Sequence, residues 1–132
     1  MSKGNYLLVT VLLASSFLTG CKTVYTGPDM KTQAVYSWGT LKATEDQPIA
    51  VVNSAALKAV DDLNLTVTMK TADSLTGLII ARDSQDNKIS IRLTSLSENS
   101  TGIKIQAGFF GNEDKSKIVY NQIRTNLKMG KK

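Results

Sequence analysis

Cys21 is the one side chain of this 132-residue chain with the chemistry of a strong nucleophile. The chain has no histidine, which excludes Ser–His–Asp and Cys–His catalytic arrangements and the usual imidazole metal sites. A single cysteine also allows no intrachain disulfide and no Cys-x-x-Cys redox pair. The carboxylates fall mostly at expected turns and helix ends, where water solvates them. We therefore expect no catalytic residue, no metal ligands and no cofactor, and a protein that is not an enzyme.

The segment before Cys21 is typical of a secretory signal. Tyr6 to Leu18 is an uncharged, mostly apolar run. It is shorter than the roughly 20 apolar residues that cross a bilayer, but it suits the apolar core of a signal peptide. Thr19 and Gly20 are small, as required where a peptidase grips an extended chain. We expect residues 1–20 to be removed.

Leu18-Thr19-Gly20-Cys21 resembles the lipobox of bacterial lipoproteins. The resemblance implies that Leu18, Thr19 and Gly20 form the signal peptidase recognition box. Cleavage before Cys21 would leave a thiol that carries diacylglycerol and an amine acylated by a fatty acid such as palmitate. Several acyl chains anchor a protein firmly, because each buried methylene contributes about 0.8 kcal/mol. The alternative is an ordinary signal peptide with a chance or buried cysteine.

The residue after Cys21, Lys22, indicates which membrane would hold such a lipid. In Gram-negative lipoproteins an aspartate after the cysteine tends to retain the protein at the inner membrane. Lys22 is not aspartate, so the resemblance implies a lipid-anchored protein of the cell envelope, at the outer membrane and facing the periplasm.

The charge distribution excludes nucleic acid as a partner. The formal net charge is +5, and loss of Lys3 with the signal peptide lowers it by one. Three further basic residues lie close to the end of the chain, at Lys128, Lys131 and Lys132. The body is therefore nearly neutral, with acidic and basic residues interspersed, whereas nucleic-acid binders carry a clustered basic face.

The rest of the chain divides into three parts. Residues 21–33 are expected to be the lipidated N-terminus and a tether, because Gly27-Pro28-Asp29 is a turn signal and no period is sustained. Residues 34–128 form one domain, and 42% hydrophobic residues suffice for its core. Residues 129–132 are a basic tail.

Alternation and helical spacing predict the elements of the domain. Residues 34–44 are expected to be one strand, with Tyr36 and Trp38 packed into the core rather than forming a ligand-stacking pair. An apolar stripe predicts a helix from Ile49, with Pro48 in its first turn and Asn64 at its end. Strands follow at 65–70, 75–82, 89–93 and 103–109, with a polar loop at 95–101, and a last helix ends near residue 128.

These elements predict an α+β fold in the order β-α-β-β-β-β-α. The short turns favour antiparallel pairing. We expect a two-layer sandwich, with a mostly antiparallel sheet and two helices on one face.

Neither face of the strand at 75–82 is polar. Leu78 and Ile80 point one way, and Ile79 and Ala81 point the other way. A two-residue turn would place the first pair beside the apolar residues of the next strand, and a three-residue bulged loop would place the second pair there. In either case, some branched side chains point away from the main core face. The alternative is that the strand is covered on both of its faces. Leu78 and Ile80 are the candidate partner-binding residues.

The domain is similar to a group of small bacterial lipoproteins known as a domain of unknown function. The matching segments are ALKAVDDLNL, LTGLIIARD and IKIQAGFFGNEDKS. The group's pattern near the end is roughly G-x-F-G-D-E-x-x-S. Its positions match Gly108, Phe110, Gly111, Glu113 and Ser116, with Asn112 in place of Asp. We interpret this stretch as a strand-to-helix corner, because calcium-loop spacing is absent and the acidic residues would repel phosphate.

Two functions agree with this reading. A small domain on a lipid tether suits an adaptor that binds another envelope macromolecule, most simply an envelope protein, through its surface or a sheet edge. The alternative is a carrier of a small hydrophobic molecule or lipid in a cavity between helices and sheet. A filled core favours the adaptor.

Overall fold

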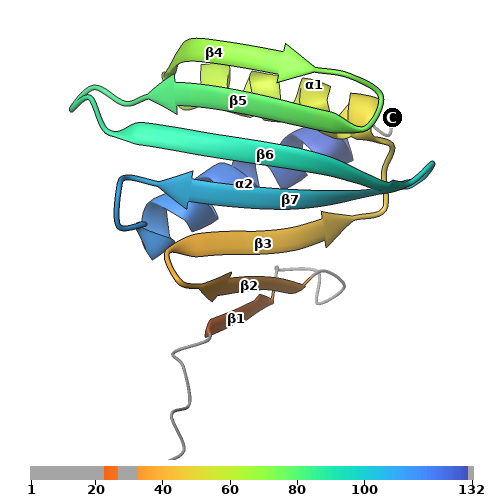
Figure 1. Ribbon diagram of the computed structural model, residues 1–132, viewed down its shortest axis with the longest axis horizontal. Helices are drawn as coiled ribbons and strands as arrows, with labels where there is room; N and C mark the ends of the chain where they lie inside the picture. The colour runs from red at the N-terminus through yellow and green to blue at the C-terminus, as the bar shows by residue number, and fades with distance from the viewer. Residues whose placement is uncertain (1–22, 27–32, 131–132) are drawn as a thin grey trace, which may run out of the picture.

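Seven antiparallel strands form one sheet, and two helices cover one of its faces, in the computed structural model of residues 23–26 and 33–130 (Figure 1). The strand order is β1-β2-β3-β7-β6-β5-β4, so β1 and β4 are the edges. This is the expected α+β sandwich, with both helices behind the sheet in Figure 1. The elements are β1 (Thr23–Thr26), β2 (Gln33–Ser37), β3 (Thr40–Glu45), α1 (Ile49–Asp62), β4 (Thr66–Ala72), β5 (Thr76–Arg82), β6 (Lys88–Ser97), β7 (Ser100–Ala107) and α2 (Glu113–Met129).

The two helices form where apolar spacing and end signals agree. α1 follows Pro48 and ends just before Asn64, which adopts a φ of 55° and stops the helix as expected. Asn112 caps α2, because its side chain accepts a hydrogen bond from the Lys115 backbone N–H at 2.9 Å. The strand-to-helix corner expected here is confirmed. α1 packs against β4, β5 and β6, and α2 against β3 and β7.

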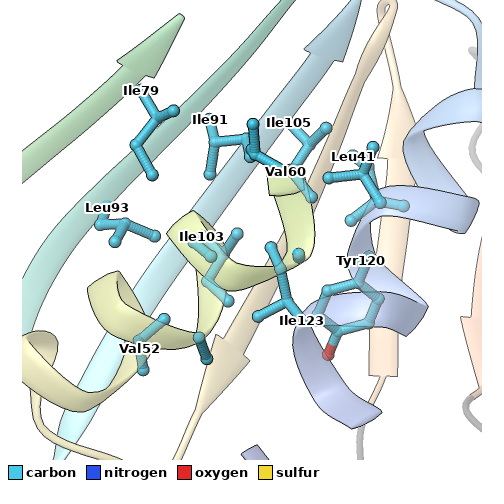
Figure 2. Close-up of a cluster of buried hydrophobic side chains, with 14 of the residues drawn as sticks. Leu41, Val52, Val60, Ile79, Ile91, Leu93, Ile103, Ile105, Tyr120 and Ile123 are labelled. Atoms are coloured by element: carbon cyan, nitrogen blue, oxygen red, sulfur yellow. The ribbon is translucent and has the colours of Figure 1, made fainter. Parts of the chain in front are cut away.

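A row of branched side chains crosses the covered face of the sheet. Leu41 lies opposite Ile105, Ile105 opposite Ile91, and Ile91 opposite Ile79. All four are at most 1% exposed. Figure 2 shows this row facing side chains of α1 and α2. Burial of each such side chain contributes about 1.5–3 kcal/mol, so this layer holds the helices on the sheet.

The segment expected to be one strand, residues 34–44, is a hairpin instead. Trp38 and Gly39 have φ angles of 51° and 75°, and two positive angles in succession make a tight two-residue hairpin turn. The expectation that Trp38 packs into the core is wrong, because the turn projects its side chain into solvent at 93% exposure. Tyr36 stays half-buried against the core. The two rings therefore do not form a stacking pair.

Two further segments are more regular than expected. The range predicted as a tether contains β1, whose residues Thr23–Thr26 pair with β2. The expected polar loop at 95–101 is instead the end of β6 and the start of β7, joined by a turn at Glu98 and Asn99. Threonine, valine and tyrosine favour strands even without an apolar face, which explains why alternation did not mark β1. The polar residues at the β6–β7 end pair through the backbone, Ser95 with Thr101 and Ser97 with Ser100.

A buried polar cluster ties α2 to the end of β3. Glu45 accepts a hydrogen bond from the Tyr120 hydroxyl at 2.6 Å, and its carboxylate lies 3.4 Å from Arg124 Nε. The Arg124 guanidinium also lies 5.9 Å from the centre of the Tyr120 ring. The side chains of Arg124 and Glu45 are 7% and 12% exposed, so this ion pair is largely shielded from water.

Replacement of Glu45 by glutamine is expected to destabilise the fold by about 3 kcal/mol, because Arg124 stays buried and loses a charged partner. Urea unfolding followed by circular dichroism measures the change. Glu98→Gln, in the exposed β6–β7 turn, is the matched control and is expected to shift stability by no more than about 0.5 kcal/mol. Equal small effects of both variants would show that the cluster contributes nothing.

Candidate functional site

The face of the sheet opposite the helices is uncovered, and it is turned toward the viewer in Figure 1. Its side chains come from alternate residues of the central strands, between those that fill the core. None of the strand residues on this open face is acidic within the described part of the chain. The open face is thus a broad surface of basic, small polar and apolar side chains.

Three basic side chains lie side by side across the middle of the open face. Lys42 of β3 lies opposite Lys104 of β7, and Lys104 lies opposite Arg92 of β6. All three are exposed, and none of them makes an ion pair with a described acidic side chain. Like charges directly opposite each other destabilise a sheet. This basic row costs stability in the isolated domain, and an acidic partner would remove that cost.

Leu78 and Ile80, the candidate partner-binding residues, extend this surface on β5. Leu78 lies opposite Arg92, while Ile79 lies opposite Ile91 in the core. The second of the two registers left open by the sequence is therefore the observed one, with a longer turn of residues 83–87 between Arg82 and Lys88. Both candidates are half-buried on the open face. They form an apolar area next to the basic row.

Two hollows lie on the open face. The larger, about 530 Å³, is at the end near the β5–β6 turn and is lined by Lys88, Arg92, Gln106 and Phe109 among others. A smaller one of about 160 Å³ lies between Thr40, Lys104 and their neighbours on β6. Basic, amide and hydroxyl groups line both, and the larger one is also lined by the carboxylate residue Asp86. The smaller one, beside Arg92 and Lys104, suits carboxylate or other anionic groups of a partner.

The β4 edge adjoins the same surface. All seven residues of β4 are exposed, and the strand pairs only with β5 among the described residues. An edge of this length presents unpaired backbone groups, and an extended segment of a partner can add to it as a further strand. The expectation of an available edge at residues 65–70 agrees with this position of β4.

No cluster of metal ligands is seen in the described ranges. Among residues 23–26 and 33–130, no group of three histidine, cysteine or carboxylate side chains could hold a metal ion. No helix there is long and apolar enough to span a bilayer. Cys21, the predicted lipidation site, and Leu18, Thr19 and Gly20, the predicted recognition box, lie outside the described residues.

Residues 5–126 match a family described as a protein of unknown function, DUF3568. The chain belongs to this family. No curated protein matches the chain. The matched range covers both helices almost completely and every strand, and the family description assigns no activity to the open face.

The basic row is the feature of this surface that sequence reasoning missed. Each of its residues occupies a polar position of an alternating strand, which is unremarkable in a solvated face. Only the pairing of β3 with β7 and of β7 with β6 brings the three together. The strand order was not readable from the sequence, so the available signal was the absence of acidic residues at these polar positions.

The turn beside the larger hollow is held by Asp83. Its carboxylate lies 2.7 Å from Lys115 Nζ and accepts hydrogen bonds from the side chain and backbone of Asn87 and the backbone of Gln85. These contacts, that with Lys115 first, hold the pKa of the Asp83 carboxyl well below its usual range. The ion pair fastens the β5–β6 turn to the start of α2.

Asp83 is expected to make stability depend on pH in acid. A carboxyl whose pKa is lowered by folding stabilises the fold above its unfolded pKa of about 3.9, and this contribution is lost as pH falls toward the lower folded value. Asp83→Asn keeps an acceptor for the turn but loses the charge, so its melting temperature should fall less steeply than that of the wild type below about pH 4.

Asp86→Asn is the matched control in the same turn. The Asp86 side chain is 84% exposed and lies 3.5 Å from Arg82, so this variant should follow the wild-type profile. Thermal melts between pH 6 and 2 compare the three proteins. A profile of Asp83→Asn that coincides with the wild type would contradict this role.

Proposed function

We propose that the protein is a lipid-anchored module of the cell envelope that binds an acidic surface of another envelope protein through the open face of its sheet. The observation that carries this proposal is the basic row beside Leu78 and Ile80, on a face that no element of the described domain covers. The protein then acts by binding, with the lipid keeping it at the membrane.

The anchor is supported by the segment that precedes the sheet. The apolar run, the small residues and Cys21 follow the lipobox pattern. The family match begins at residue 5, so this segment lies inside the range that the chain shares with the family. Lys22 in place of aspartate supports the outer membrane, with the domain facing the periplasm.

The binding role is supported over the carrier role by the packing of the domain. The large side chains between the helices and the sheet are buried against one another, as Figure 2 shows for the centre of this layer. Polar and charged residues predominate in the lining of the two hollows of the open face, which suits a polar partner better than a hydrophobic ligand.

The chemistry of the partner follows from the open face. The complementary partner has carboxylates spaced along a line across the strands, opposite Lys42, Lys104 and Arg92. It also has apolar side chains at one end of that line, opposite Leu78 and Ile80. A partner with both features would neutralise the repulsion in the row and cover the apolar area.

Lipidation is tested by metabolic labelling. A labelled fatty acid is expected to enter the wild-type protein and not Cys21→Ala, because the thiol is where the lipid chain is attached. Mass spectrometry of the N-terminal peptide locates the modification. Ser54→Ala, a substitution on the exposed side of α1, is the control and should label as the wild type. Label that persists in Cys21→Ala would overturn the anchor.

Partner binding is tested by photo-crosslinking in intact cells. A photoreactive residue at Ser90, in the middle of the open face, is expected to give a defined protein adduct, whereas the same residue at Ser54 on α1 gives none. Arg92→Gln with Lys104→Gln should reduce the adduct several-fold. Leu78→Asp should do the same in a domain that remains folded by circular dichroism.

Lys58→Gln on α1 is the matched charge control, because this residue is exposed and lies away from the open face. It should leave the Ser90 adduct unchanged. Equal adducts from both positions, or an adduct that persists in the Arg92→Gln and Lys104→Gln variant, would show that the open face is not the binding surface.

A further inference from the structure

Three aromatic side chains project into solvent at one end of the sheet. Trp38, in the β2–β3 turn, is 93% exposed, and Phe109 and Phe110, in the corner between β7 and α2, are 87% and 89% exposed. Trp38 is the only tryptophan of the chain. The two phenylalanine rings lie edge to face with centres 4.9 Å apart. We call Trp38, Phe109 and Phe110 the aromatic tip.

The turn and the corner that carry the tip are in direct contact. A Cβ added to Gly39 would lie 2.6 Å from the Phe110 carbonyl oxygen, and one added to Gly111 would collide with the backbone of Gly39. Only glycine permits this approach of two backbones. Figure 1 shows the β2–β3 turn beside the start of α2, on the left of the view.

The backbone of the corner is also held by hydrogen bonds. The Gly108 N–H donates to the Lys88 carbonyl at 2.7 Å, and Gln106 Nε2 donates to the Phe109 carbonyl at 3.2 Å. The tip is therefore a fixed feature of the fold, with its backbone packed and its rings directed outward.

Folding gives no reason for these residues at these positions. Trp38 adopts a φ of 51°, a region that strains a bulky side chain and favours asparagine or glycine. It gains almost no burial in return. Three nearly fully exposed aromatic rings at one end of a small domain indicate a surface that is covered by something outside the domain.

The start of β1, the described strand that follows Cys21 in the sequence, lies at the same end of the sheet. Thr23 pairs with Tyr36 of β2, and Trp38 follows two residues later in the β2–β3 turn. Cys21 is only two residues before Thr23 in the sequence, a span of at most about 7 Å. A lipid on Cys21 would therefore hold this end of the sheet, and not the opposite end, against the bilayer.

We propose that the aromatic tip inserts into the interfacial layer of the leaflet that holds the lipid on Cys21. Tryptophan and other aromatic side chains favour this layer of a membrane. Asp86 and Lys88 both line the hollow beside Phe109. Charges of both signs therefore lie near the tip, and insertion depends on the rings rather than on attraction to anionic headgroups. This inference rests on the lipid anchor of the proposed function and adds a second, protein-borne membrane contact.

Trp38 is its own probe for this contact, since no other tryptophan contributes to the emission. The lipidated protein is reconstituted into phosphatidylcholine vesicles and into matched vesicles whose acyl chains carry bromine, a quencher that acts at short range. Insertion predicts that Trp38 emission shifts to shorter wavelengths and is weaker in brominated vesicles than in unbrominated ones.

Phe109→Ser with Phe110→Ser keeps the probe but removes the other two rings, and it is expected to reduce both the spectral shift and the quenching. Leu75→Ser is the matched control. Leu75 is 67% exposed beside the β4–β5 turn, at the other end of the strands, so its loss should change neither readout.

The outcomes separate the tip from the anchor. Mass spectrometry of the same preparation shows whether Cys21 carries lipid. Emission that is equal in brominated and unbrominated vesicles, in a protein that is lipidated, overturns the insertion and leaves a protein partner as the cover of the tip. A protein without lipid on Cys21 overturns the anchor, and with it the inference.

Discussion

The antiparallel register of β3, β7, β6 and β5 determines both faces of the sheet together. Leu41, Ile105, Ile91 and Ile79 lie in one row beneath the helices. Their neighbours in sequence form the matching row on the open face, which consists of Lys42, Lys104, Arg92 and Leu78. Because side chains alternate with a period of two, a shift of one residue in the β3–β7 or β7–β6 pairing would bury a lysine or arginine and expose a branched apolar side chain. The core thus fixes the basic row in place, although that row is itself unfavourable.

The two ends of the strands have different surroundings under this arrangement. The end that carries the β2–β3 turn, the β7–α2 corner and the start of β1 holds the aromatic tip and the predicted lipid. The β4–β5 and β6–β7 turns are at the other end. If the tip meets the membrane, the strands run away from it. The hollow that Phe109 lines then lies next to the bilayer, and the rest of the open face stays accessible. Anchoring and binding then use neighbouring parts of one sheet.

Much of the fold could be predicted from the sequence, because long periodic segments carry their own signal. The two helices, the central strands and their antiparallel pairing all followed from apolar spacing and turn residues. The β2–β3 hairpin did not, since alternation continues through Trp38 and only Gly39 marks the turn. A large hydrophobic residue such as tryptophan is unusual in a left-handed turn. The local sequence pattern therefore predicted a core position for Trp38.

The candidate site was less predictable than the fold. Leu78 and Ile80 stood out because their strand is apolar on both sides, but which pair entered the core depended on the length of the following turn. The basic row depends on which strands are neighbours, and β3 pairs with β7 across more than fifty residues of intervening chain, including α1. Contacts of that kind are a property of the topology, and no window of sequence contains them.

Charge distribution separates the two sides of the molecule. On the helical side, Lys58 lies 3.0 Å from Asp62 and Lys117 lies 2.9 Å from Glu113, so basic groups there are neutralised within their own helices. The basic row of the open face makes no such ion pair among the described residues. Where a domain balances its charges on one side and leaves them unbalanced on the other, long-range attraction orients an acidic partner toward the unbalanced side before contact is made. A carboxylate inserted into the row would stabilise the isolated domain, and it would remove the surface that we propose an acidic partner binds.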